Sequence, residues 1–217
     1  QLGYRNTANS WDAWTKEEFE QYIRDLVVFG TNAIESIPIF DEKVSPHFKV
    51  KPDEMNAFIS ATCQKYSLDY WMWIPAQFDL NDVALRNKYL ANFEQICKQS
   101  VRVNGVFFPG GDPGDNPPQL VMPLLQDLST ILKKYHPQAS TWVSLQGFSP
   151  EQSQYVYQYI QDKLPPWLGG LITGPSSPTV EETRAALPAR YKIRHYPDLT
   201  HNVRCEFEIP WWDPSFA

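Results

Sequence analysis

The sequence predicts an α/β fold, a (β/α)8 barrel of the TIM type that is incomplete in this chain, with about seven strands visible. Two observations lead to this prediction: strand-like and helix-like segments alternate along the chain, and polar or aromatic residues follow nearly every strand. Alternating segments favour a parallel sheet with helices outside it. In a barrel, the carboxyl ends of the strands open on one face, where active sites lie.

The first helix has clear signals at both ends. Thr15 is suited to cap its amino end, Glu18 stands three residues later as in a capping box, and Gly30 is suited to end it. Apolar residues at helical spacing lie between these signals: Phe19, Tyr22, Ile23, Leu26 and Val27. A truncated strand is predicted at the start of the chain, just before Tyr4, and a short strand is predicted after the helix, over residues 31–39.

The same alternation continues to the end of the chain. Further helices are predicted over residues 51–66, 80–100, 118–135, 149–164 and 179–187, and further strands over 68–76, 104–111, 139–148, 168–174 and 191–198. The strands recur at close to the ~30-residue repeat of a (β/α)8 barrel. A doubly wound sheet is the alternative, but the chain has neither GxGxxG nor GxxxxGK[ST] after a strand.

Residues 1–217 are predicted to form a single barrel domain, because no linker or change in composition divides them. We expect this domain to be part of a longer polypeptide, since about one and a half barrel units are missing and the chain begins at Gln1. Other domains or segments of the same parent protein are therefore expected partners.

Composition excludes several classes of partner. The net charge of −6 and the lack of a Lys/Arg cluster argue against nucleic acid, and no apolar run reaches the ~20 residues that span a membrane. No cofactor motif is present. His195, His201 and Cys205 match no standard zinc spacing, so no metal site is predicted. The cysteines are too scattered to predict a disulfide framework: Cys63, Cys97 and Cys205.

Three carboxyl groups are candidate catalytic residues. Asp112 and Asp115 follow a buried strand on the Gly- and Pro-rich loop "FFPGGDPGDNPP", and Glu35 stands in an apolar strand end, where a charge needs a partner or a function. Asp112 and Asp115 have an alternative role as turn or helix-cap residues. Arg5 is an alternative ion-pair partner for Glu35.

Other polar and aromatic residues at strand ends are candidate contacts to a substrate. Aromatic rings can stack on sugars, and Arg and Gln side chains can hydrogen-bond hydroxyl or carboxylate groups. The predicted set is Tyr4, Arg5, Trp73, Gln146, His195 and Tyr196. Trp142 is a weaker candidate, because its side chain is expected to point toward the helices.

The loop "FFPGGDPG" resembles the strand-end GGD of the barrel β-N-acetylhexosaminidases, and the wider layout is similar to bacterial carbohydrate-active proteins related to the hexosaminidase and α-glucuronidase barrels. The resemblance implies that Asp112 orients a sugar substituent. The family's general acid follows that Asp directly, and Pro113 stands at this position here. Asp115, Glu35 or a group in the missing segment would then supply the proton.

Two functions follow. The first is a glycoside hydrolase acting on an oligo- or polysaccharide through a pair of carboxyl groups. The second is a carbohydrate-binding or assembly domain with a degenerate glycosidase site, which Pro113 favours. A barrel isomerase or aldolase for sugar phosphates is disfavoured, because no strand ends in Lys and no phosphate loop follows the last strands. A role on glycans favours an extracytoplasmic location.

Overall fold

The computed structural model describes residues 13–37, 39 and 48–195. Helices and strands alternate throughout this range, as predicted. The helices are α1 (Lys16–Val28), α2 (Pro52–Lys65), α3 (Val83–Gln99), α4 (Pro118–Tyr135), α5 (Pro150–Lys163) and α6 (Val180–Ala186). The strands are β1 (Ala33–Glu35), β2 (Asp69–Trp73), β3 (Gly105–Phe108), β4 (Ser140–Ser144), β5 (Leu168–Thr173) and β6 (Lys192–His195).

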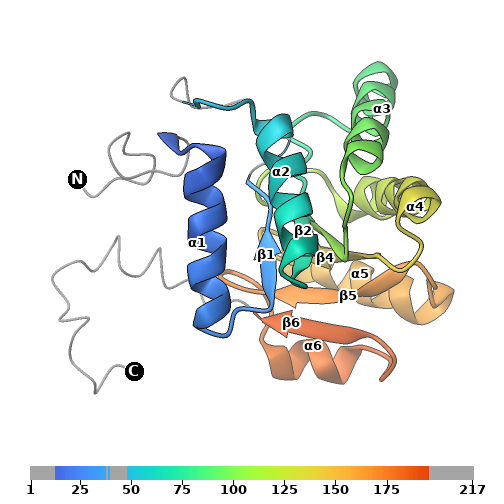
Figure 1. The fold of residues 1–217 in the computed structure, drawn as a ribbon. Coiled ribbons are helices and arrows are strands. Elements are labelled where there is room, and N and C mark those ends of the chain that lie inside the picture. The colour runs from blue at the N-terminus through green and yellow to red at the C-terminus, as the bar shows by residue number, and fades with distance from the viewer. Residues whose placement is uncertain (1–12, 38, 40–47, 196–217) are drawn as a thin grey trace, which may run out of the picture.

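The strands of the described residues form one parallel sheet, in which each strand pairs with its neighbours along the chain from β1 to β6. Figure 1 shows the sheet curling from β1 to β6, with the helices around its outside. The predicted parallel α/β fold is confirmed as an incomplete barrel of the TIM type, open between β1 and β6 within the described residues. The additional strand expected near Tyr4 lies outside them.

The two faces of the sheet carry two separate clusters of apolar side chains. The larger cluster fills the space between sheet and helices, and includes Tyr70, Met72, Val106 and Phe108. Successive side chains of a strand point to opposite faces, so the intervening residues face the concave side. A small cluster of Trp71, Trp142 and Ile172, with Ala33 and Phe107 packed against it, lies there.

The helix ends agree with the signals in the sequence. Thr15 accepts a hydrogen bond from the backbone N–H of Glu18, whose side chain accepts one from the N–H of Thr15. These two bonds form the predicted capping box. Helix α1 ends at Val28, and Gly30 follows with φ of +86°.

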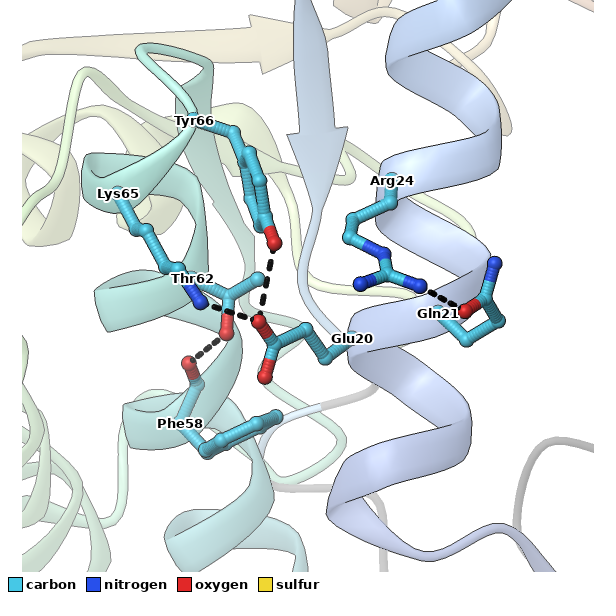
Figure 2. Close-up of polar contacts among 7 residues, drawn as sticks. All are labelled: Glu20, Gln21, Arg24, Phe58, Thr62, Lys65 and Tyr66. Carbon is cyan, nitrogen blue, oxygen red and sulfur yellow. Dashed lines mark hydrogen bonds and ion pairs between the residues drawn. The ribbon is translucent and has the colours of Figure 1, made fainter.

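Helices α1 and α2 are joined by polar contacts as well as by packing (Figure 2). Glu20 Oε1 accepts hydrogen bonds from Lys65 Nζ at 2.5 Å and from the Tyr66 hydroxyl at 3.0 Å. These contacts reduce the pKa of Glu20 below its ordinary value, the Lys65 bond having the largest effect. They fix α1 beside α2 and next to β1 at the edge of the sheet.

No helix among the described residues is both long and apolar enough to cross a bilayer. Cys63 and Cys97 are buried free thiols, and burial raises the pKa of each to about 12. Neither thiol is therefore suited to act as a nucleophile near neutral pH. Cys205 lies outside the described residues.

Candidate functional site

The carboxyl ends of all strands in the described residues lie along one edge of the sheet, because the strands are parallel. Glu35, Trp73 and His195 are the last residues of β1, β2 and β6. Asp112 and Gln146 lie in the loops that follow β3 and β4. Five of the predicted site residues therefore belong to this edge. Tyr4, Arg5 and Tyr196 lie outside the described residues.

Asp112 and Gln146 hold two neighbouring loops together. The backbone oxygen of Gln146 accepts hydrogen bonds from the N–H groups of Gly111 at 2.8 Å and Asp112 at 3.2 Å. Gln146 Nε2 donates a further bond to Asp112 Oδ2 at 3.3 Å. The backbone bonds fix the position of Asp112, while its side chain stays exposed to solvent.

The glycines of these loops serve close packing. A Cβ atom on Gly110 would lie 2.1 Å from the backbone oxygen of Ser144, and one on Gly111 would lie 2.6 Å from the backbone of Gly147. Neither Gly110 nor Gly111 has a positive φ, so close packing rather than backbone conformation requires glycine there. The positive φ values belong to Gly114, at +126°, and Gly147, at +77°.

Asn116 is a structural residue of the site that sequence reasoning missed. Its side chain is 6% exposed, and its Nδ2 donates to the backbone oxygens of Ala76 at 3.1 Å, Phe78 at 2.9 Å and Gly114 at 3.1 Å. Its Oδ1 accepts from the N–H of Leu80 at 3.0 Å. Asn116 thereby binds the loop after β2 to the loop after β3. The turn-like sequence "GDN", which ends in Asn116, was the signal for a structural role, because Asn side chains often bond to backbone groups in turns.

Asp115 occupies a turn next to Asn116. Its φ is +52°, and its N–H donates to the backbone oxygen of Gly111 at 2.8 Å. The residue lines an open pocket of about 480 Å³ together with Phe78 and Asp79 of the loop after β2. Asp115 therefore lies on the side of its loop that faces β2.

Among the described residues, Glu35 is a carboxyl group whose surroundings suit proton transfer. Its position alternates with the outward-facing Ile34, which places Glu35 on the concave side. Glu35 is exposed to solvent along part of its side chain, while protein atoms lie around its carboxyl group. This partial desolvation raises the pKa of Glu35 to about 7, and the positive charge of Arg194 opposes the rise.

The end of β1 is held to β2 on one side and borders a pocket on the other. The N–H of Ser36 donates to the backbone oxygen of Trp71 at 2.7 Å, and the N–H of Trp73 donates to Ser36 Oγ at 3.0 Å. A pocket of about 450 Å³ lies between β1 and α1, lined by Glu35 and by side chains of α1 such as Tyr22.

Trp71, Trp142 and Arg194 form an aromatic and cationic cluster on the concave face. The two indole rings lie 5.4 Å apart with 60° between their planes. The guanidinium carbon of Arg194 lies 3.7 Å from the Trp71 ring and 5.9 Å from the Trp142 ring. Trp142 Nε1 donates to Ser140 Oγ at 2.7 Å. Trp142 therefore faces the concave side, and the expectation that it points toward the helices is wrong.

His195 and Arg194 take opposite faces of β6. Arg194 is in register with Ile172, which belongs to the concave cluster, and His195 is in register with Thr173. The Thr173 Oγ1 and His195 Nδ1 atoms lie 3.0 Å apart, in hydrogen-bonding contact. Sequence reasoning chose His195 and missed Arg194, because the register of a four-residue strand is needed to tell which of two adjacent residues faces inward.

Comparisons with known proteins bear on the fold. No model of a protein family matches the chain, and no curated protein sequence matches it. A xylose isomerase domain-containing protein from Salmonella typhimurium superposes with a TM-score of 0.50 at 15% identity, covering 84% of this chain and 64% of that one. A xylose isomerase domain protein from Planctomyces limnophilus gives a TM-score of 0.49 at 16% identity, covering 81% and 67%.

An unliganded α-L-fucosidase from Lactobacillus casei gives a TM-score of 0.44 at 10% identity, covering 88% of this chain and 73% of that one. The likeness to the Salmonella domain supports the barrel fold, and the chain spans 64% of that domain's length. The structures named here are not hexosaminidase or α-glucuronidase barrels, so the resemblance of the GGD loop stays a prediction.

Proposed function

We propose that this domain is a glycoside hydrolase that binds an oligo- or polysaccharide at the carboxyl-end edge of its sheet and acts through Glu35 and Asp112. The observation that carries the proposal is the placement of Glu35 at the carboxyl end of β1, on the edge of the sheet to which Asp112 also belongs, where desolvation raises its pKa to about 7. A carboxyl group with such a pKa is partly protonated at neutral pH, as a general acid must be. Asp112 supplies a second carboxyl group on a loop fixed by backbone hydrogen bonds.

The reaction assigned to this pair is hydrolysis of an O-glycosidic bond. Glu35 donates its proton to the leaving oxygen as the bond from that oxygen to the anomeric carbon breaks. A water oxygen bonds to the same carbon, and Asp112 accepts the proton that this water loses. The proton then returns from Asp112 to Glu35 through solvent. Strands β1 and β3 are separated by β2, which puts their backbones roughly 10 Å apart. Carboxyl groups that face each other across β2 leave room for one water molecule, which is the arrangement of a glycosidase in which water attacks directly.

The remaining predicted residues have supporting roles in this proposal. Trp73 provides an aromatic surface at the end of β2, and Gln146 orients Asp112. His195 ends β6 at the same edge and contacts Thr173 on the face of the sheet opposite Arg194. Asp115 supplies a third carboxyl group, in a turn on the side of the loop that faces β2.

The second candidate function is binding of a glycan without hydrolysis. Pro113 favours it, because this residue takes the position at which the family with the GGD motif has its acid. The two functions differ in whether Glu35 transfers a proton, which is what the experiment must measure.

The test is a screen of the 217-residue protein against aryl glycosides and natural polysaccharides, with release of reducing ends and calorimetric binding measured in parallel. Glu35→Gln and Asp112→Asn are each expected to lower turnover about 100-fold while binding persists. Glu17→Gln, which changes an exposed glutamate of α1, is the matched control and should leave turnover unchanged. Binding without turnover in the unaltered protein would favour the second function. Neither binding nor turnover with any glycan would refute both.

A further inference from the structure

Arg194 is unusual among the arginines of the described residues. Its guanidinium group stacks on the Trp71 ring, and no hydrogen bond or ion pair within this part of the chain uses its N–H groups. Every other described arginine donates at least one side-chain hydrogen bond: Arg24, Arg86, Arg102, Arg184 and Arg190. An exposed arginine that packs on an aromatic ring and keeps its donors unused is a candidate for binding an anion.

The stack fixes the guanidinium group without consuming its donors. A cation over an aromatic face is attracted by the electrons of the ring. In this contact the edge of the planar group stays available for a bidentate interaction with an oxyanion. The stack therefore lowers the entropy that Arg194 would otherwise lose when a ligand binds.

Glycines leave space for the two indole rings of Trp71 and Trp142, which together with Arg194 we call the platform. A Cβ atom on Gly105 would lie 2.6 Å from the Trp71 ring, and one on Gly170 would lie 2.7 Å from the Trp142 ring. Glycine at these two strand positions lets both rings pack closely against the concave face. The indole N–H of Trp71 is buried and has no hydrogen-bond partner in the described chain, so the platform holds a second unused donor.

We propose that Arg194 on Trp71 forms a subsite for an anionic substituent of the saccharide, a carboxylate or a sulfate ester, within the concave face of the half-barrel. The inference rests on the proposed carbohydrate function and narrows it to charged sugars. Carboxylate and sulfate share the oxygens that a guanidinium group binds.

The charge of Arg194 connects this subsite with Glu35, the general acid of the proposed hydrolysis. Arg194 acts on Glu35 electrostatically and lowers its pKa, against the larger effect of desolvation. An anion bound to Arg194 would offset that positive charge and favour the protonated form of Glu35. Tyr22 of α1 lines the same pocket as Glu35, and Lys192 is a further charged residue on the concave face of β6. The bound substituent would then promote the protonation that the acid needs.

The experiment compares three ligands by calorimetry on the 217-residue protein: glucuronic acid, glucose 6-sulfate and glucose. One or both charged sugars are expected to bind at least tenfold more tightly than glucose, and the tighter of the two identifies the substituent. Arg194→Met should remove this preference. Arg24→Met removes an equal charge from α1 and should leave the preference intact.

A second variant separates a lost contact from a damaged fold. Arg194→Lys keeps the charge but not the planar fork, so it should keep part of the preference over glucose and favour carboxylate less. Equal binding of all three ligands, or an unchanged preference in Arg194→Met, would overturn the subsite while the proposed function stands on the glycan screen. If the protein bound no saccharide in the glycan screen and none of the three sugars by calorimetry, both the subsite and the proposed function would be overturned.

Discussion

The side chain of Gln146 donates to the carboxyl group of Asp112 over 3.3 Å, while the backbone oxygen of Gln146 receives the N–H of Asp112. One residue of the loop after β4 thus fixes both the backbone and the side chain of the aspartate that follows β3. The position of Asp112 therefore depends on both loops. The backbone bonds from Gly111 and Asp112 to Gln146 do not involve the charge of Asp112.

Asp112→Asn is expected to leave folding nearly unchanged, because the backbone bonds to Gln146 remain and an exposed charge contributes little to stability. Turnover of a glycan substrate should fall about 100-fold or more, as when an acid-base or electrostatic group is lost. Thermal melting and steady-state kinetics measure the two effects. Asp115→Asn is the matched comparison, since Asn tolerates the positive φ of Asp115. A variant Asp112→Asn with full activity would make Asp112 a turn residue, and a large fall in its melting temperature would make it a structural cap.

Gly147→Ala is expected to destabilise the fold for two reasons. Its φ of +77° is costly for alanine, and the added Cβ would lie 2.7 Å from the Cβ of Asp112. Gly30→Ala isolates the first cost, because Gly30 has φ of +86° and no atom within 4 Å of the added Cβ. We expect Gly30→Ala to cost about 1–2 kcal/mol and Gly147→Ala at least twice that. Urea unfolding measures both, and equal losses would show that the two loops can move apart.

Asn116→Ala should lower the free energy of unfolding by about 2–4 kcal/mol. The change leaves three backbone oxygens and one N–H without the partner that they have in the structure. Asn81→Ala is the control, because Asn81 is exposed and its side chain makes one bond to Asp79, so its loss should cost below about 0.5 kcal/mol. Equal effects of the two changes in urea unfolding would mean that water replaces Asn116.

The pKa of Glu35 predicts how stability and activity depend on pH. Since this pKa rises from 4.5 in the unfolded chain to about 7 in the folded one, the folded protein binds more protons between these values. Its stability should therefore decrease as the pH rises through that window, and the cost is complete above the folded pKa. Contact with solvent keeps the effect small.

Glu35→Gln removes this titration. Melting temperatures should be compared between pH 4 and 9. As the pH rises, the melting temperature of the variant should increase relative to that of the unaltered protein, and the difference should be constant above about pH 8. In the unaltered protein, kcat/KM should decline about tenfold per unit above pH 7 as Glu35 loses its proton. Parallel melting curves for the two proteins would contradict the shifted pKa.

Local signals in the sequence were sufficient for the elements and for the positions of most candidate residues. The capping box of Thr15 and Glu18 depends on neighbours in the chain, and strand spacing predicts the parallel sheet and hence the common edge. The inward direction of Arg194 and Trp142 was missed, because it depends on pairing register between strands. Asn116 was missed because its partners lie about 40 residues away in another loop.

The order of the strands has a consequence for how the domain assembles. Within the described residues, each strand pairs with the strands just before and after it in the chain, and adjacent helices pack in the same order, as α3 does against α4. Cooperativity in such an arrangement passes mainly from neighbour to neighbour, as in a solenoid. The contact of Arg194 of β6 with the Trp71 ring of β2 adds a link across the concave face. Each new strand that emerges from the ribosome can pair with the strand made just before it. The sheet is therefore suited to form strand by strand during synthesis, from the N-terminus to the C-terminus.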